Sequence, residues 1–161
     1  MADRLRGFER RRRHLPHHEE PGATYFVTAT LFRPPAVDLT RSDIGCLVVE
    51  ALLFRDGAHY ALYDYTVMPD HFHAILKPTV TDCTTPYLYR IMQGVKSWLA
   101  REINRRAGRR GRLWQDESYD RIIRDEAEYQ RCAQYILDNP RMEGLIEDPM
   151  AWPWWGKGSG Q

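Results

Sequence analysis

The sequence lacks several features that would place it in a specialised class of proteins. Its 161 residues contain no apolar run near the ~20 residues that a helix needs to span a bilayer. The first residues carry arginines with no apolar segment behind them, so no secretory signal is predicted. Only three cysteines are present, and their spacing fits neither a disulfide framework nor a CxxC metal site. We therefore expect a cytoplasmic protein with reduced thiols and no membrane partner.

Net charge is also low, at +1, but the basic residues are unevenly distributed. Residues 1–13 have a local charge of +4 and residues 96–112 one of +6, mostly from arginine. Arginine suits bidentate contacts with phosphate, and clustered positive charge is typical of proteins that bind a polyanion. A solvated tail and a solvated helix end are the alternative, and charge alone does not decide between them. The candidates for contacts with a nucleic-acid backbone are Arg10, Arg11, Arg12, Arg13, Lys96, Arg105, Arg109, Arg110 and Arg112.

The composition itself, with 43% hydrophobic and 28% charged residues, is that of a single folded domain. We predict a basic arm over residues 1–22, the domain over residues 23–156 and a flexible tail over the glycine-rich residues 157–161. The tryptophans of the chain offer surfaces on which unpaired bases stack, but large aromatic side chains are more often buried. Packing in the core or over the sheet is therefore the favoured interpretation for Trp114, Trp152, Trp154 and Trp155.

Hydrophobic periodicity predicts strands and helices in the order β-α-β-β-α-β, followed by one more helix that carries Tyr135. This order is typical of a ferredoxin-like, or split βαβ, α+β fold, with an antiparallel sheet and helices on one face. The other face is then left for a site or a partner. The predicted strands span residues 24–32, 59–68, 71–76 and 119–124. The predicted helices run from a cap at Thr40 or Ser42 to Gly57, from a cap at Thr84 or Thr85 to Gly108, and from a cap at Asp125 to Asp138, where Pro140 ends the helix.

His71 and His73 lie two residues apart in a predicted strand, so both imidazoles project from one face while Phe72 points to the other. Two imidazoles on one face of a rigid strand are half of a metal site. Two polar residues on a solvated face produce the same short pattern, so the pattern alone leaves both interpretations open.

Tyr135 and Asn139 lie four residues apart, which places both on one face of the final helix. An asparagine carbonyl oxygen can complete a hard-cation site that two histidines begin. Tyr129 points elsewhere, because six residues correspond to a rotation of ~240°. In isolation, however, a half-buried aromatic explains Tyr135 better and a helix C-cap explains Asn139 better, and the following Pro140 disfavours helical geometry at Asn139.

Several segments together resemble the REP-associated tyrosine transposases, a branch of the single-tyrosine HUH transposases. Their joint order and spacing extend over residues 14–156, and one departure is the large Phe72 inside the HUH triplet. The segments are His14–Pro16 with Gly22–Thr28, Met68–Leu76, Leu113–Gln115 with Tyr119–Asp125, Tyr135–Pro140 with Gly144–Leu145, and Trp152–Trp154.

The resemblance implies that His71 and His73 bind a divalent metal, Mg²⁺ or Mn²⁺, and that Tyr135 attacks a DNA phosphodiester. Asn139 falls where relatives place a third ligand, and Arg121 matches a family position that we add to the DNA-binding candidates. The implied substrate is single-stranded DNA folded into hairpins from repetitive extragenic palindromes (REP). It would be cleaved and rejoined through a 5′-phosphotyrosine intermediate, by a monomer or a homodimer.

Other functions fit the same sequence less well. A domesticated hairpin-binding protein without catalysis would keep this fold, and the intact set of candidate site residues argues against it without deciding the matter. An RNA-binding sheet module is disfavoured because the glycine- and aromatic-rich RNP signatures are missing. An amidohydrolase-type metal site would need further ligands and a much longer barrel. The sequence also has no GxxxxGK[ST] loop, which agrees with a reaction that needs no ATP.

Overall fold

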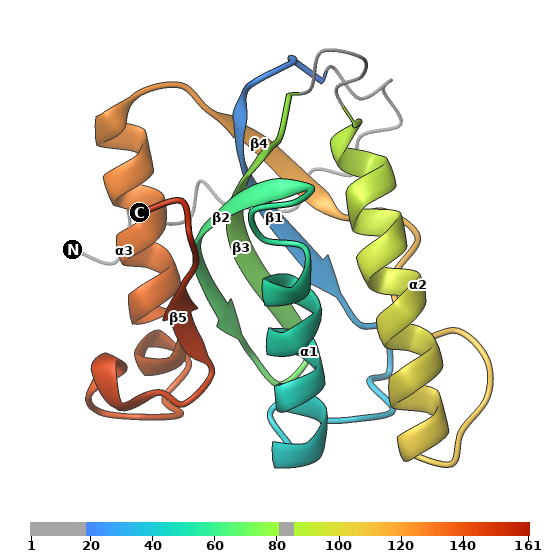
Figure 1. The fold of residues 1–161 in the computed structure, drawn as a ribbon. Coiled ribbons are helices and arrows are strands. Elements are labelled where there is room, and N and C mark those ends of the chain that lie inside the picture. The colour runs from blue at the N-terminus through green and yellow to red at the C-terminus, as the bar shows by residue number, and fades with distance from the viewer. Residues whose placement is uncertain (1–18, 81–85) are drawn as a thin grey trace.

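An antiparallel sheet of five strands lies at the centre of the structure, with helices on both sides (Figure 1). The computed structural model describes residues 19–80 and 86–161. The predictions for Arg10 to Arg13 and for a cap at Thr84 or Thr85 therefore lie outside the described residues. The elements in chain order are β1 (Thr24–Thr30), α1 (Ser42–Phe54), β2 (Tyr60–Val67), β3 (His71–Pro78), α2 (Leu88–Arg106), β4 (Tyr119–Ile123), α3 (Glu126–Met142), the short 3₁₀ helix η2 (Pro149–Ala151) and β5 (Trp155–Lys157).

The strand order is β4-β1-β3-β2-β5, and every neighbouring pair is antiparallel. The first four strands have the order of the ferredoxin-like fold, so the predicted α+β class is confirmed. The predicted hairpin is also present: β2 and β3 are joined by a tight turn in which the Met68 amide donates to the His71 carbonyl at 2.8 Å. This turn places His71 at the start of β3, next to the end of β1.

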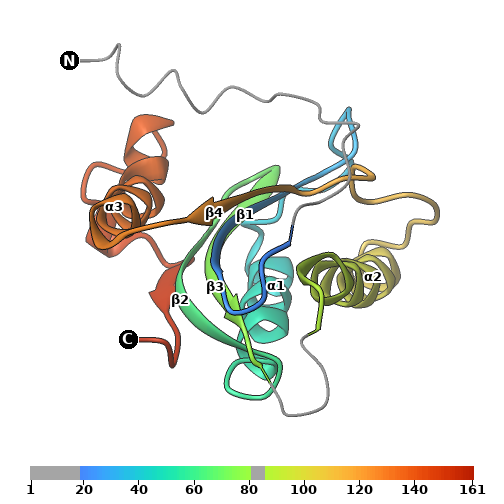
Figure 2. The same cartoon turned by 90° about the horizontal axis from the view of Figure 1, so that it is seen from above.

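The two faces of the sheet are covered by different helices (Figure 2). α1 and α2 pack on one face over a large apolar cluster that includes Tyr25, Val27 and Ala29 of β1. α3 packs on the other face, over a smaller cluster that includes Phe26 and Ile75. Alternate side chains of β1 thus pack into the two apolar clusters, as expected for a strand that is buried on both faces. Within the described residues, no helix combines the length and apolarity that crossing a membrane requires.

The C-terminal end of α3 differs from the prediction that Pro140 terminates it. Pro140 lies inside the helix, which continues to Met142. A proline removes one backbone donor but does not prevent later amides from bonding. Gly144, at φ +72°, donates to Arg141 at 3.0 Å, and Leu145 donates to the Pro140 carbonyl at 2.9 Å. These two bonds form a Schellman motif, which ends the helix. Asn139 is consequently a helical residue on the Tyr135 face and not a C-cap.

The N-terminal end of α2 is capped by a residue from a distant part of the sequence. The local N-cap residue, Tyr87, makes no side-chain capping bond. Instead, the Glu19 carboxylate accepts hydrogen bonds from the backbone amides of Leu88 at 2.6 Å and Tyr89 at 2.9 Å. A carboxylate there also interacts favourably with the helix dipole. The last residues of the predicted arm are therefore tied to α2.

Replacing Glu19 with alanine should lower the free energy of unfolding by ~1 kcal/mol, the usual effect of losing a cap. The change would appear in urea unfolding as a lower midpoint with an unchanged slope. Glu20→Ala is the matched control, because the described contacts of Glu20 come from its backbone. Equal stability of the Glu19→Ala and wild-type proteins would contradict a capping role.

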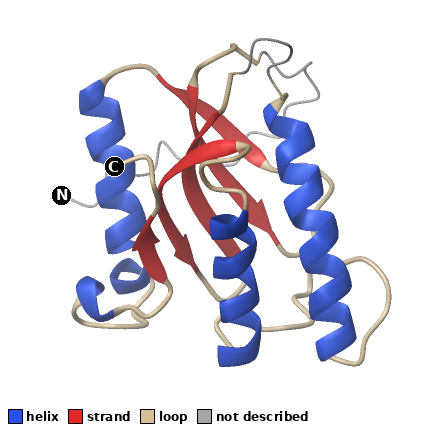
Figure 3. Ribbon diagram, in the orientation of Figure 1, coloured by secondary structure: helices blue, strands red, loops and turns tan. Residues whose placement is uncertain are grey.

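Residues after Trp154 extend the sheet, in contrast to the predicted flexible tail over 157–161. β5 pairs with β2 at the edge of the sheet (Figure 3). Beyond β5, the amides of Gly158 and Gly160 donate to the carbonyls of Tyr63 and Leu62, both at 2.7 Å. Ser159 adds two hydrogen bonds to the Asp56 carboxylate. Local composition missed this strand because its pairing comes from contacts with β2. The favoured packing of the tryptophans agrees with the structure, in which Trp114 is buried and Trp154 and Trp155 pack on opposite faces of the sheet.

Candidate active site

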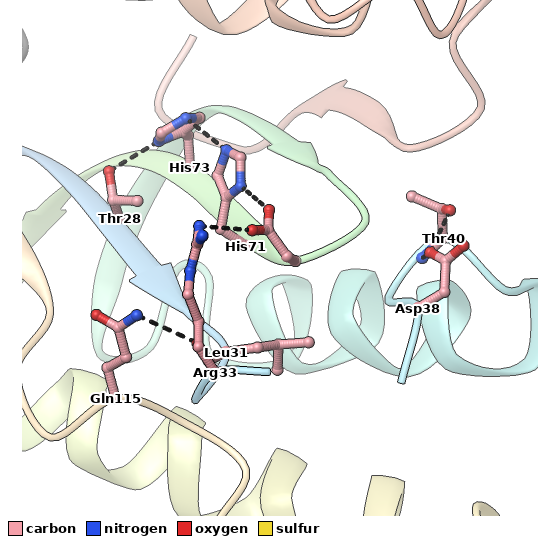
Figure 4. A network of polar contacts seen from close by, with 9 residues as sticks. Thr28, Leu31, Arg33, Asp38, Thr40, His71, His73 and Gln115 are labelled. Carbon is pink, nitrogen blue, oxygen red and sulfur yellow. Dashed lines mark hydrogen bonds and ion pairs between the residues drawn. The ribbon is translucent and has the colours of Figure 1, made fainter. Parts of the chain in front are cut away.

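The two histidines of β3 lie on the sheet face that α3 covers, as strand alternation predicts. Phe72 between them is buried on the opposite face, where its ring meets Trp114 edge-on at a centroid distance of 5.7 Å. The Nε2 atoms of His71 and His73 are 3.1 Å apart, and their ring centroids are 4.6 Å apart (Figure 4). The Nε2 atoms of the two imidazoles are therefore close enough to bind one metal ion together.

The other ring nitrogen of each histidine is held by an oxygen atom. His71 Nδ1 lies 2.6 Å from Asp70 Oδ1, and His73 Nδ1 lies 2.8 Å from Thr28 Oγ1 of β1 (Figure 4). The second oxygen of Asp70 accepts from Arg33 Nη2 at 3.2 Å. Such partners fix the orientation of a metal-binding imidazole and leave Nε2 for the ion.

The hydrogen-bond partners also restrict the tautomers. A carboxylate only accepts, so Asp70 places a proton on Nδ1 of His71; in the neutral imidazole, Nε2 is then the nitrogen with the lone pair. The Thr28 hydroxyl both donates and accepts, so it is compatible with either tautomer of His73. His73 is 5% exposed, and burial together with the neighbouring His71 lowers its pKa well below the usual value. His73 is thus held in the neutral state that binds metals.

Tyr135 of α3 packs against His73. Its ring centroid is 5.4 Å from that of His73 and 6.0 Å from that of Phe26. Burial raises the pKa of the Tyr135 phenol, and a hydrogen bond from the Asn139 side chain acts in the opposite direction. A bond that lowers a phenol pKa is one donated to its oxygen, so the Asn139 amide nitrogen faces Tyr135. The (i, i+4) pair predicted on one helix face is present.

The remaining polar atom of Asn139 has a different environment. The residue is 3% exposed, and its Oδ1 is buried without a hydrogen-bond partner among the described residues. An unpaired buried carbonyl oxygen is unfavourable, and a bound cation would satisfy it. Within residues 19–80 and 86–161, no three His, Cys, Asp or Glu side chains are placed to hold a metal ion. Two imidazole nitrogens and this amide oxygen fit Mg²⁺ or Mn²⁺ as a partial ligand set.

Tyr129, the alternative tyrosine on α3, has another partner. Its hydroxyl donates to Asp64 Oδ2 at 2.8 Å, and its ring meets Tyr63 at a centroid distance of 5.7 Å. Burial and the Asp64 carboxylate raise the pKa of Tyr129 to about 12. The predicted divergence of the two tyrosines is confirmed, and Tyr135 is the one that adjoins the histidines.

Two of the basic residues predicted to bind DNA make polar contacts with other residues of the protein. Lys96 Nζ donates to the carbonyls of Gln115 at 2.8 Å and Asp116 at 3.2 Å, and burial lowers the Lys96 pKa. Arg121 of β4 forms an ion pair with Glu128, which also accepts from the Arg124 amide at 2.9 Å. Both side chains thereby stabilise the segments around them.

The other basic candidates that the structure describes lie at or after the C-terminal end of α2. Arg105 pairs with Glu102 at 2.7 Å, and Arg109 donates to Asn104 Oδ1 at 2.6 Å. Arg110 is exposed. The guanidinium of Arg112 lies 4.4 Å from the ring centroid of Phe32. Arg112 therefore contacts the segment that follows β1, through the ring of Phe32.

Sequence reasoning missed the residues that orient the histidines. Asp70 directly precedes the histidine triplet, and that adjacency was the available signal. Thr28 is 45 positions from its partner His73, so only the register of β1 and β3 reveals the contact. Arg33 follows β1, and nothing local indicates that it reaches Asp70.

Comparisons with known proteins agree with the fold. A curated protein of Haemophilus influenzae, named "Putative REP-associated tyrosine transposase", is 27% identical over 149 residues, covering 83% of this chain and 78% of that protein. The chain is similar to the REP-associated tyrosine transposases. The resemblance seen in the motifs is thereby confirmed. A solved structure of a REP-associated tyrosine transposase bound to a REP hairpin superposes with a TM-score of 0.73 at 19% identity, over 89% of this chain and 81% of that one. No family model matches.

Proposed function

We propose that this protein cleaves and rejoins single-stranded DNA beside a hairpin, through a covalent bond to Tyr135. One observation carries the proposal: the Tyr135 ring packs 5.4 Å from that of His73, so a nucleophile adjoins two metal-type ligands. The similar transposase was solved on a REP hairpin, and we propose hairpin DNA of this kind as the partner here.

In the proposed reaction, the Tyr135 oxygen forms a bond to phosphorus while the bond from phosphorus to the neighbouring 3′ oxygen breaks. The phenol loses its proton and the departing 3′ oxygen gains one. The products are a 5′-phosphotyrosine and a free 3′-hydroxyl. Because one phosphate diester replaces another, the reverse reaction can join the strand to a different 3′-hydroxyl without ATP.

The side chains around Tyr135 have separate roles in this proposal. Burial of the phenol opposes loss of its proton, and the hydrogen bond from Asn139 favours it. His71 Nε2, His73 Nε2 and Asn139 Oδ1 would hold a divalent cation, while Asp70 and Thr28 orient the imidazoles. The bound cation would polarise the phosphate and stabilise negative charge on the phenol oxygen.

The experiment that tests the function is capture of the covalent intermediate. The protein is incubated with end-labelled hairpin oligonucleotides that carry unpaired flanks, in the presence of Mg²⁺ or Mn²⁺. We expect a labelled adduct that survives denaturing electrophoresis and disappears after proteolysis. Tight binding of the hairpin without any adduct would instead support a domesticated DNA-binding protein.

Replacing Asp70 with asparagine should weaken the binding of the metal ion that the reaction needs. Asparagine lacks the charge that holds His71 and Arg33, and loss of such a partner typically costs about 10- to 100-fold in metal affinity. The measurement is adduct formation against Mn²⁺ concentration, in which the half-saturating concentration should rise by that factor. Asp43→Asn, which removes an exposed carboxylate paired with Arg41, is the matched control. Identical Mn²⁺ curves for the Asp70 variant and wild type would contradict the orienting role.

A further inference from the structure

The face of β1 that carries the candidate site continues beyond the two histidines. Phe26 and Thr28 contact Tyr135 and His73, and Thr30 lies opposite His71 in the sheet register. The next residue in this alternation is Phe32, whose amide still bonds in extended fashion to the Leu113 carbonyl at 2.8 Å. Two residues of extended chain place Phe32 ~7 Å beyond Thr30. Phe32 is nevertheless 45% exposed.

A guanidinium is held against the Phe32 ring. Arg112 Cζ lies 4.4 Å from the ring centroid, which is the geometry of a cation–π contact. The edge of the Arg112 fork is fixed by two acceptors, the Trp114 carbonyl at 2.9 Å and Asp116 Oδ1 at 2.6 Å. The ring and the guanidinium thus form a small stack, in which two acceptors orient the guanidinium.

Arg33, the residue after Phe32, reaches toward the histidines through Asp70. Its side chain is 57% exposed, and Nη2 pairs with Asp70 at 3.2 Å, so the guanidinium stands beside His71 (Figure 4). A phosphate near the histidines would meet a cation on this side. Arginine is the side chain best suited to such a contact, because its fork binds phosphate oxygens in pairs.

We propose that Phe32 and Arg112 form a stacking platform for an unpaired base of the DNA strand that flanks the reacting phosphate, with Arg33 on its backbone. The inference rests on the proposed function, and it assigns the residues over which the flanking DNA strand runs. Bases stack on aromatic rings and on guanidinium planes, and a neighbouring cation neutralises the phosphates. A base inside a duplex has both faces covered, so the platform selects unpaired DNA.

The two carboxylates in this region limit the affinity of the platform. Asp70 and Asp116 pair with Arg33 and Arg112, and each repels a DNA phosphate. Asp116→Asn removes one negative charge, keeps a side-chain oxygen that can accept from Arg112, and does not alter the candidate site. It should tighten binding of flanked hairpins by about two- to fivefold at low salt, with a smaller gain at high salt.

Two hairpin oligonucleotides test the platform, one blunt and one with unpaired flanks on both strands. Phe32→Ala should weaken binding of the flanked hairpin by about tenfold, the loss expected for one stacked base, and leave the blunt hairpin unaffected. Phe32→Tyr, which keeps an aromatic ring, should bind the flanked hairpin with wild-type affinity. The control is Phe54→Ala, which removes an 85% exposed phenylalanine at the end of α1. A fluorescent base analogue in the flank should be quenched by wild type and not by Phe32→Ala.

The outcomes separate this inference from the proposed function. Adduct formation by wild type together with unchanged flank binding by Phe32→Ala would overturn the platform alone. Equal weakening of blunt and flanked hairpins by Phe32→Ala would also overturn it, since the side chain would then support the hairpin or the fold. Failure of wild type to bind either hairpin would overturn both proposals. A loss confined to the flanked hairpin, with the fluorescence change, supports the platform.

Discussion

Tyr135→Phe should reduce formation of the covalent protein–DNA adduct by at least about 10³-fold, because the variant has no oxygen to attack phosphorus. Hairpin affinity should stay within about twofold of wild type, since the ring that packs on His73 and Phe26 is retained. Stability should fall by ~1 kcal/mol through loss of the hydrogen bond with Asn139. Denaturing electrophoresis of the labelled reaction measures the adduct, and anisotropy measures the affinity.

Tyr129→Phe is the matched control for this result. It removes a hydroxyl from the same helix and breaks a bond to the buried Asp64 carboxylate, so its effect on stability is comparable or larger. Adduct formation should nevertheless persist. An adduct of normal yield in Tyr135→Phe, or its loss in Tyr129→Phe alone, would show that the nucleophile is misassigned.

Removing His73, which we propose as a metal ligand, should have an effect of similar size. Chelation of divalent cations should stop adduct formation by wild type, and Mn²⁺ should restore it. His73→Ala should show less than about one-hundredth of wild-type activity and no recovery with added Mn²⁺. A binding readout accompanies the activity: a cation at 100 times its Kd stabilises a folded protein by ~2.7 kcal/mol. Mn²⁺ should therefore raise the melting temperature of wild type and leave that of His73→Ala unchanged.

His59→Ala provides the comparison, because His59 is exposed and lies before β2, outside the candidate site. It should keep both the activity and the Mn²⁺-induced rise in melting temperature. Full activity of wild type in chelator would remove the cation from the mechanism. An unchanged melting-temperature shift in His73→Ala would place the ion elsewhere.

Local patterns were sufficient where neighbours in sequence decide the conformation. Asp125 was expected to cap α3, and its carboxylate accepts from the Glu128 amide at 2.7 Å. The alternation that sends Phe72 to one face and both histidines to the other follows from strand geometry alone. The structure differs from the predictions where distant partners act. Pro140 does not end α3, and residues of the predicted tail over 157–161 bond with β2. Distant partners also hold Lys96, predicted to contact DNA, whose ammonium donates to the Gln115 carbonyl in the structure.

Periodicity along single elements was enough to identify two half-sites, the histidine pair on a strand and the Tyr135–Asn139 pair on a helix. That these halves meet depends on α3 crossing the sheet face opposite α1 and α2, which no short stretch of residues encodes. The orienting contacts of Thr28 and Asp70, and the position of Arg33, likewise arise from strand register and loop packing. Contacts between residues tens of positions apart depend on how whole layers pack, because burial of apolar surface, and not local backbone preference, sets their arrangement.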